Sequence, residues 1–506
     1  MIKRRIFCGS ALAAMATVAL PVSRLMAAAA APISNDIAAI NGAGQQILLT
    51  RSDIEDLRAT LRGALLLPVD EGYDRARRIW NGAFDRHPAL IARCAGGADV
   101  IQAVNFGRAH DLLVAVRGGG HSFSGQSVCE GGLMIDLSPM KSIRVDPVGK
   151  TAKLEPGVLL NEFDREAQAF GLATTAGTIS HTGVAGLTLG GGFGRLCRKY
   201  GLACDNLRSV DLVAANGQFL RASAGENPDL FWGVRGGGGN FGVVTSFEFQ
   251  LHPVASTLLG GVLIFPLAQA RDVLDFFAGF ASSAPDELNT DVLLTTLPDG
   301  QRVVLIDVCW CGLIESGERA LKPLRQFRKS LEDTIAPIPY VRLQSSGDTD
   351  YPIGRRYYFK SGFVKHIDRA LVDEMVARFE SSPLSSLTVV FVHHGGAVRR
   401  VPRDATAFWH RDAGHSVILE SSWDNPLDAE KNTEWVRSTW RGLEPFTDGF
   451  YVNELAPDET ERRIRANYGA NYGRLVGLKR KFDPNNLFRM NANVKPSGLT
   501  PPNQQQ

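Results

Sequence analysis

The chain has 506 residues, of which 52 are glycine, and 55 Lys and Arg against 53 Asp and Glu leave a formal net charge of +2. Glycine exceeds its average use of roughly 7%, but it shows neither the Gly-X-Y period of collagen nor low-complexity runs, which excludes a fibre and a disordered chain. The 44% of hydrophobic residues suffices for large cores. The near-neutral charge, without a basic stripe interleaved with aromatic residues, argues against nucleic-acid binding.

The first 31 residues predict an export signal. Arg4 and Arg5 precede an apolar run over residues 8–22, and an alanine tract follows at 27–31. This order of charged, apolar and small residues is typical of a secretory signal, and the arginine pair followed by Phe7 resembles a twin-arginine signal. The run is too short to span a bilayer, which disfavours the alternative, a membrane anchor. We therefore expect export to the periplasm or secretion, with no membrane attachment of the mature form.

The cysteines predict neither a disulfide scaffold nor a metal site. Six of them follow the signal, and none forms the paired C-x-x-C knuckles of a zinc site: Cys94, Cys129, Cys197, Cys204, Cys309 and Cys311. An oxidising compartment would permit disulfides but does not require them.

Glycine is concentrated in one quarter of the chain. Residues 118–242 contain 25 of the 52 glycines, in three clusters at 118–120, 190–194 and 236–239. Each cluster lies next to a strand-like run: LLVAVR, SVDLVAANG and FGVVTSFEF. Glycine beside a strand allows positive φ and close approach of the backbone to a ligand, and successive N–H groups can form an anion nest. The clusters therefore predict a ligand cradle rather than three ordinary turns.

The cradle does not have the pattern of the two common nucleotide-binding loops. Residues 190–194 read GGGFG, but they do not follow a clean apolar strand, so the strand, G-x-G-x-x-G and helix of a Rossmann unit are not met. No G-x-x-x-x-G-K-[ST] sequence occurs, which excludes a P-loop.

The region after residue 255 predicts a β-sheet with helices. Alternating or apolar runs indicate strands at 257–266, 291–297, 302–310, 386–394 and 415–423. Between them, residues 270–284 and 369–382 have the spacing of amphipathic helices.

Four motifs, in order, resemble one family. They read VAVRGGGHS at 114–122, GLTLGGGFGRLCRKYGLACDNL at 186–207, NPDLFWGVRGGGGNFGVVT at 227–245 and KFDPNNLFRMNANV at 481–494. Together with the bridging sequence GGAVRRVPRDATAFWHRDA at 395–413, they are similar to the berberine-bridge-enzyme-like flavoprotein oxidases of the PCMH-type, or vanillyl-alcohol-oxidase, superfamily. The resemblance covers about residues 50–495.

The resemblance implies an α+β fold with two lobes. A PCMH-type FAD-binding domain is expected over residues 50–255, and a C-terminal segment at 451–497 would complete it. A substrate domain at 256–450 would be an antiparallel sheet with helices on one face. The sequence does not indicate an oligomeric state.

The resemblance also implies a covalent flavin. In this family the histidine after the R-G-G-G turn is bonded to the 8α-methyl carbon of FAD, and His121 stands there. Many members add a second bond from a cysteine to flavin C6, but the alignment places Ile179 at that position, and Cys197 and Cys204 lie too far along. We therefore expect FAD attached once, through His121.

The remaining cofactor residues follow from the same motifs. The backbones of residues 118–120 and 190–194 would hold the pyrophosphate and the flavin carbonyls, with Arg117 and Ser122 nearby. Along the isoalloxazine would lie Thr178, His181, Thr182 and Gly183. Asn491 and Asn493 would close the site from the tail, and Phe193 is expected to pack. The full expected set beside His121 is Arg117, Gly118, Gly119, Gly120, Ser122, Gly177, Thr178, His181, Thr182, Gly183, Gly186, Gly190, Gly191, Gly192, Gly194, Val243, Asn491 and Asn493.

Tyr451 is the predicted catalytic residue. Hydride removal from an alcohol carbon is easier when the hydroxyl proton leaves at the same time, and a tyrosinate can accept it where positive charge lowers the tyrosine pKa from about 10. The family places such a tyrosine in a Y-x-N element, which Tyr451 to Asn453 match; packing at the domain junction is the alternative. Lys360, His393, His394 and Glu420 lie on substrate-domain segments that can also face the flavin.

The expected function is oxidation of a small molecule. We expect transfer of hydride from a hydroxyl-bearing carbon of a sugar or alcohol to FAD, with O2 reoxidising the flavin to give H2O2. A dehydrogenase that uses another electron acceptor and a flavin-binding module without turnover are the alternatives.

Overall fold

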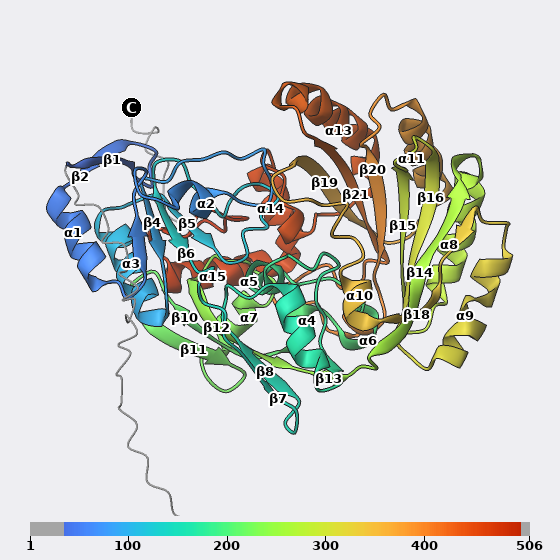
Figure 1. The fold of residues 1–506 in the computed structure, drawn as a ribbon, viewed down its shortest axis with the longest axis horizontal. Helices are drawn as coiled ribbons and strands as arrows, with labels where there is room; N and C mark the ends of the chain where they lie inside the picture. The colour runs from blue at the N-terminus through green and yellow to red at the C-terminus, as the bar shows by residue number, and fades with distance from the viewer. Residues whose placement is uncertain (1–34, 497–506) are drawn as a thin grey trace, which may run out of the picture.

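The computed structural model describes residues 35–496 and shows two lobes that lie side by side (Figure 1). Both lobes mix helices with sheets, which confirms the predicted α+β class. The predicted export signal at 1–31 falls outside the described residues. Within them, no helix combines the length and the apolar character needed to cross a bilayer.

The first lobe begins with a mainly parallel sheet. Its strand order is β3-β4-β6-β5, with β4, β6 and β5 parallel and β3 antiparallel to β4. The elements of this part are β1 (Ile37–Ile40), β2 (Gln46–Leu49), α1 (Arg51–Thr60), β3 (Ala64–Leu66), α2 (Tyr73–Arg77), β4 (Leu90–Arg93), α3 (Gly97–Ala109), β5 (Val114–Arg117) and β6 (Leu133–Asp136).

A second, antiparallel sheet completes the first lobe. Its strand order is β11-β10-β12-β8-β7, and a small pair, β9 with β13, lies beside it. The elements are β7 (Ile143–Asp146), β8 (Thr151–Leu154), α4 (Leu160–Gln168), β9 (Leu172–Ala173), α5 (Val184–Leu189), α6 (Cys197–Tyr200), η1 (Ala203–Asn206), β10 (Leu207–Val213), β11 (Phe219–Ser223), α7 (Pro228–Val234), β12 (Val243–Gln250) and β13 (His252–Pro253).

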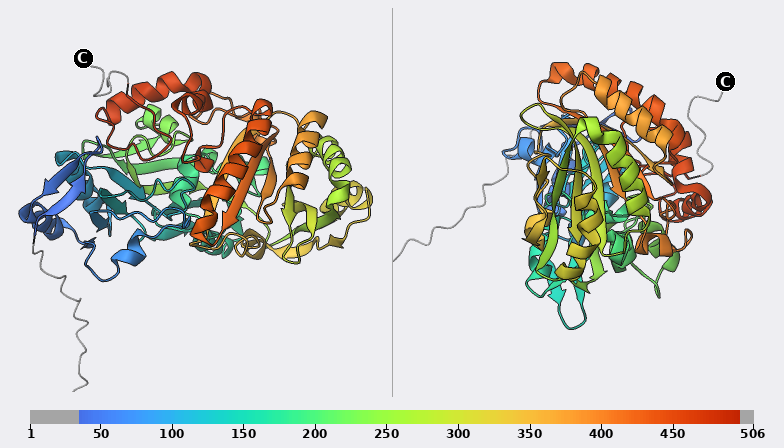
Figure 2. Two further views of the ribbon diagram at one scale, coloured as in Figure 1. Left: turned by 90° about the horizontal axis from the view of Figure 1, so that it is seen from above. Right: turned by 90° about the vertical axis from the view of Figure 1, so that its right-hand side faces the viewer.

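The second lobe is one large antiparallel sheet covered by helices on one face (Figures 1 and 2). Its strand order is β17-β14-β16-β15-β20-β21-β19, and β18 also pairs with β14. The strands are β14 (Thr257–Pro266), β15 (Leu288–Thr296), β16 (Arg302–Trp310), β17 (Glu332–Asp333), β18 (Ala336–Pro339), β19 (Arg356–Val364), β20 (Thr388–His393) and β21 (His415–Trp423). The helices are η2 (Leu267–Gln269), α8 (Ala270–Ser282), α9 (Ile314–Gln326), α10 (Tyr340–Gln344), α11 (Arg369–Ser381), α12 (Ala397–Arg400), η3 (Pro426–Asp428), α13 (Ala429–Leu443) and η4 (Glu444–Phe446).

Apolar and polar side chains alternate along the central strand β15, so one face of this sheet is apolar and the other carries polar groups. Val292 and Leu294 are buried in the core that the sheet forms with α8, α9, α11 and α13. Asn289 and Asp291 lie on the opposite face, since successive side chains of a strand point to opposite sides. The polar face therefore looks toward the first lobe.

The C-terminal segment packs into the first lobe. It contains η5 (Val452–Glu454), α14 (Glu461–Tyr468), η6 (Gly469–Asn471) and α15 (Tyr472–Phe482). Leu475 and Leu478 join the core of the antiparallel sheet, and Leu487 and Phe488 join the core of the parallel sheet. The last described residues thus connect both sheets of the first lobe.

Candidate active site

A cavity of about 370 Å³ lies between the two lobes, within the range of 300–1,000 Å³ that is usual for ligand sites. Residues from the first lobe, from the second-lobe sheet and from the C-terminal segment all line it. Thirteen of the predicted cofactor residues and Tyr451 are among them: Gly118, Gly119, Gly120, His121, Ser122, Gly177, Thr178, Thr182, Gly183, Gly186, Gly194, Val243 and Asn491.

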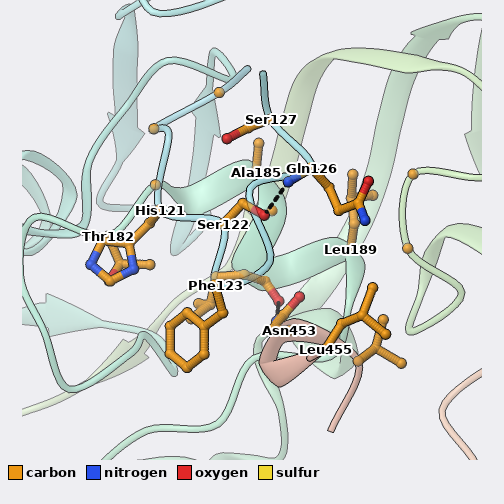
Figure 3. A pocket seen from close by; sticks show the side chains of 18 of the residues that line it. His121, Ser122, Phe123, Gln126, Ser127, Thr182, Ala185, Leu189, Asn453 and Leu455 are labelled. Atoms are coloured by element: carbon orange, nitrogen blue, oxygen red, sulfur yellow. Dashed lines mark hydrogen bonds between the residues drawn. The ribbon is translucent and has the colours of Figure 1, made fainter. Parts of the chain in front are cut away.

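His121 lies at one wall of this cavity, close to Thr182, Ser122 and Phe123 (Figure 3). Its ring stacks on Trp80 with centroids 4.1 Å apart. Burial, reinforced by the neighbouring His181, lowers the pKa of His121 to about 3, so that its imidazole is neutral at pH 7. The buried Nε2 atom has no hydrogen-bond partner among the described residues. A neutral ring with an unused nitrogen beside a cavity is suited to bonding to a ligand there.

Two glycine loops touch each other in the cavity wall. A Cβ atom added to Gly119 would lie 2.3 Å from Gly183 Cα, and one added to Gly183 would lie 2.5 Å from Gly119 N. Gly120 has a φ of +71°, which side chains rarely adopt. Glycine is therefore required here because the backbones of the 118–120 and 177–183 segments touch.

The 190–192 run lies against the C-terminal segment. Gly190, Gly191 and Gly192 do not line the cavity, in contrast to Gly194. A Cβ on Gly190 would lie 2.1 Å from Asn453 Oδ1, and the Gly192 N–H donates to Tyr451 Oη at 2.8 Å. These glycines allow the C-terminal segment to approach the first lobe, and their contact with the cofactor stays a prediction.

Three other predicted cofactor residues also lie outside the cavity lining. The Arg117 guanidinium bonds to the Ala76 carbonyl and packs below the Gly120 turn. His181 lies against the ring of His121, with centroids 5.1 Å apart. Asn493 directly precedes Val494, which is buried in the core of the antiparallel sheet. Gly238 and Gly239 line the cavity, although the sequence analysis did not assign them to the cofactor. The sequence signal that could have identified this pair was its membership of the third glycine cluster, 236–239.

Tyr451 lines the cavity, but its hydroxyl is already bonded inside the protein. It accepts from the Gly192 N–H at 2.8 Å and from Asn453 Nδ2 at 2.6 Å. Burial raises the pKa of Tyr451 above its usual value, and no lysine or arginine lines the cavity among residues 35–496. The predicted lowering of its pKa by positive charge is therefore wrong, and a catalytic role for this tyrosine stays a prediction.

The four second-lobe candidates do not line the cavity. Lys360 is paired with Asp458 at 3.0 Å, and Glu420 accepts from the Tyr351 hydroxyl at 2.7 Å. His393 Nε2 lies 2.8 Å from Arg198 Nη1, and His394 stacks on Phe193. Phe193 itself lines the cavity as well as packing against this histidine.

Two carboxyl groups in the cavity wall were missed by the sequence analysis. Burial raises the pKa of Asp291 on β15 to about 7, although its carboxylate accepts the His393 backbone N–H at 3.0 Å. Burial likewise raises the pKa of Glu454 to about 8. The available signals were a single carboxylate in an apolar strand and a glutamate directly after the Y-x-N element.

No thiol lines the cavity within the described part of the chain, and Ile179 does line it. The six described cysteines are all free, at Cys94, Cys129, Cys197, Cys204, Cys309 and Cys311. In the same residues, no cluster of three His, Cys, Asp or Glu side chains could hold a metal ion.

The residues present fit a flavin dinucleotide. The two touching glycine loops present backbone, without side chains, to the cavity. A Cβ atom added to Gly186 would have no heavy atom within 4 Å, so there is open space beside it. His121 Nε2 has no hydrogen-bond partner among the described residues. Val114, Leu137, Val243 and Phe488 add an apolar part to the wall.

Comparison with known proteins agrees with this fit. Residues 88–223 match the FAD binding domain family and residues 450–495 match the berberine and berberine-like family. A FAD-linked oxidoreductase of Dictyostelium discoideum is 34% identical over 88% of this chain and 97% of that protein. The (R)-6-hydroxynicotine oxidase of Paenarthrobacter nicotinovorans is 32% identical over 87% of this chain and 98% of its own length. The crystal structure of a carbohydrate oxidase from Microdochium nivale superposes with a TM-score of 0.79 at 26% identity, covering 88% of this chain and 99% of that one.

Proposed function

Because the chain belongs to the berberine-bridge-enzyme-like family of FAD-linked oxidoreductases, we propose that it is an oxidase that removes hydride from a hydroxyl-bearing carbon. The substrate class is a sugar or another alcohol-type small molecule. Bound FAD would supply the two-electron acceptor and would pass the electrons to O2, which gives H2O2.

The observation that carries this proposal is the environment of His121. Its neutral ring presents an unpartnered, buried Nε2 to the wall of a glycine-rich cavity. A covalent bond from this ring to FAD would use that nitrogen, and Ile179 in place of a cysteine supports a single attachment. The Trp80 ring fixes the orientation of the imidazole by stacking on it.

The protein's own residues would bind and orient the substrate from the second lobe. Asn289, Asp291 and Ser416 line the cavity on the polar face of the sheet, and Ile418 adds an apolar contact. Amide, carboxyl and hydroxyl groups can bond to the hydroxyls of a substrate. Because no lysine or arginine lines the cavity in residues 35–496, an anionic substrate has no partner there.

The names of the relatives support oxidase chemistry, since they include a nicotine oxidase and a carbohydrate oxidase. The predicted twin-arginine signal at 1–31 supports export to the periplasm or secretion. A tethered cofactor is suited to that location because it cannot be lost where no supply exists.

Anaerobic reduction of the bound flavin tests the function. The purified protein is mixed with a panel of sugars and alcohols without oxygen, and the flavin absorption is followed. Bleaching by one class of hydroxyl compound, then rapid recovery in air with one H2O2 per flavin, is expected. Bleaching without rapid recovery in air would identify a dehydrogenase, and no bleaching by any member would contradict the proposal.

A further inference from the structure

Glu454 lies in the same short turn as Tyr451 and Asn453. The 3₁₀ helix η5 (Val452–Glu454) follows Tyr451 directly, and the Glu454 N–H donates to the Tyr451 carbonyl at 2.8 Å. All three polar side chains line the cavity between the lobes. The turn therefore presents an amide, a phenol and a carboxyl group in one wall.

These three groups differ in what they already bind. Tyr451 Oη accepts two hydrogen bonds, and Asn453 Nδ2 donates to Tyr451 Oη at 2.6 Å and to the Leu187 carbonyl at 2.9 Å. Glu454 Oε2, in contrast, is buried and has no hydrogen-bond partner in the described structure. Buried carboxyl oxygens are normally hydrogen-bonded. An unpartnered one in a cavity wall is available to a ligand that donates a hydrogen bond.

The titratable groups around Glu454 favour a neutral carboxyl that can exchange a proton. Burial is the main cause of its raised pKa, Glu420 on β21 adds to the effect, and the Ser361 hydroxyl on β19 opposes it. Tyr451 faces it from its own turn, and its pKa is raised as well.

Lys360, which precedes Ser361 on β19, does not neutralise Glu454. Lys360 is held by Asp458 at 3.0 Å and Glu459 at 3.6 Å, and does not line the cavity. Of the other titratable groups that line the cavity, His121 is neutral and Asp291 is a second buried carboxyl group. A group whose pKa lies close to the working pH is the most effective proton acceptor.

We propose that Glu454, rather than Tyr451, accepts the hydroxyl proton of the substrate; this rests on the proposed oxidase function. The substrate O–H bond breaks and its proton passes to Glu454 Oε2. The electron pair left on oxygen forms the C=O bond while the hydrogen on carbon leaves with its electron pair to oxidised FAD. O2 then takes two electrons together with the hydride hydrogen and the proton released by Glu454, which gives H2O2 and restores the carboxylate.

In this assignment Tyr451 is a positioning residue. Its hydroxyl connects the Gly192 N–H to Asn453 and so fixes the turn that carries Glu454. Asp291 contributes to substrate binding from the opposite lobe, where its carboxylate is partly used by the His393 N–H.

The test compares Glu454→Gln with the wild type in two measurements on FAD-loaded protein. The first is the rate of anaerobic flavin reduction against pH, with the substrate found in the panel. The wild-type rate should rise through about pH 8 and then level off, whereas the variant should be about 100-fold slower or more and independent of pH. The second is infrared titration without substrate, in which the variant should lack one carboxylic acid band that the wild type loses near that pH.

Glu420→Gln is the matched control, because it removes a buried carboxyl group that does not line the cavity. Since Glu420 raises the pKa of Glu454, this variant should keep the plateau rate and shift the inflection to lower pH. Asp291→Asn should raise the substrate concentration needed for half-maximal rate and keep the pH dependence.

The outcomes are separable from those of the proposed function. Failure of every sugar and alcohol to reduce the wild-type flavin refutes the oxidase function, and the base assignment with it. A reducible wild type with an equally fast Glu454→Gln variant refutes only the assignment. Loss of the pH dependence in Asp291→Asn or Tyr451→Phe but not in Glu454→Gln, or an infrared titration unchanged by Glu454→Gln, would also overturn it.

Discussion

Replacing Lys479 with methionine is expected to destabilise the first lobe and loosen the tail that closes the cavity. Lys479 and Asp483 are both 0% exposed, and their Nζ and Oδ2 atoms are 2.7 Å apart. The ammonium also donates to the carbonyls of Asn240 and Phe488, at 2.9 and 2.8 Å. One buried cation therefore connects α15, the residue that follows the third glycine cluster, and the tail.

The magnitude follows from what the substitution leaves behind. Methionine keeps most of the volume but leaves Asp483 as a buried carboxylate, supported only by the N–H groups of Leu487 and Phe488. Removing one partner of a buried ion pair costs about 3–5 kcal/mol. For a domain of this size, 1 kcal/mol lowers the melting temperature by about 2–4 °C, so a decrease of roughly 6–20 °C is expected.

Melting of the FAD-loaded protein, followed by circular dichroism at one scan rate, measures the effect. Lys495→Met is the matched control, because Lys495 pairs with Glu461 at 2.7 Å but is 55% exposed. Exposed ion pairs contribute about 0–1 kcal/mol, so the control should melt within a few degrees of the wild type. Equal melting temperatures for the two variants would refute the reasoning about the buried pair.

Three further predictions concern the cavity and the contact between the lobes. Gly119→Ala should abolish FAD retention, because its Cβ would lie 2.3 Å from the facing backbone, whereas Gly225→Ala, with nothing within 4 Å, should retain FAD in the same absorption assay. Tyr451→Phe should keep its FAD and slow anaerobic flavin reduction no more than about 30-fold, since two hydrogen bonds of about 1 kcal/mol each are lost; a loss of 100-fold or more in stopped-flow experiments would restore this tyrosine as the base. Burial raises the pKa of Asp164 to about 7, so the folded protein holds a proton there and this contribution to stability is lost as pH rises from about 4 through 7. Asp164→Asn should therefore melt higher than the wild type at pH 8 and equally at pH 4, and equal melting at both would disprove the buried acid.

Alternating or apolar runs made part of the second lobe predictable. The strands expected at 257–266, 302–310 and 415–423 have those bounds in the structure. β19 (Arg356–Val364) was not predicted, because Lys360, Ser361 and Gly362 interrupt its apolar pattern. It is nevertheless a full strand, since it pairs with β21 along its whole length. Long-range pairing of this kind leaves no local signal.

The C-terminal region shows the same limit. The sequence of residues 461–482 is typical of one helix, but in the structure it divides into α14 and α15, separated by η6 at Gly469–Asn471. Gly469 has a φ of +48°, so the chain turns there. The spacing of apolar residues continues across this turn, which is why the sequence alone does not reveal it.

In the candidate site, the sequence located the loops but not the direction in which each residue faces. Gly119 and Gly190 belong to equally dense glycine clusters, yet one lines the cavity and the other accommodates Asn453. Asp291 and Glu454 are 163 positions apart in the chain and line the same cavity only because the sheet of the second lobe faces the C-terminal turn. Such an arrangement depends on tertiary contacts that no local motif records.

The central claim is that FAD is bonded to this protein once, through His121. Mass spectrometry of peptides from the denatured, protease-digested protein tests it most directly. The peptide that contains His121 should carry the added mass of one FAD, no cysteine-containing peptide should carry it, and His121→Ala should yield no flavin-bearing peptide. A wild-type digest in which all the flavin is free, or in which it is bonded to another residue, would contradict the claim.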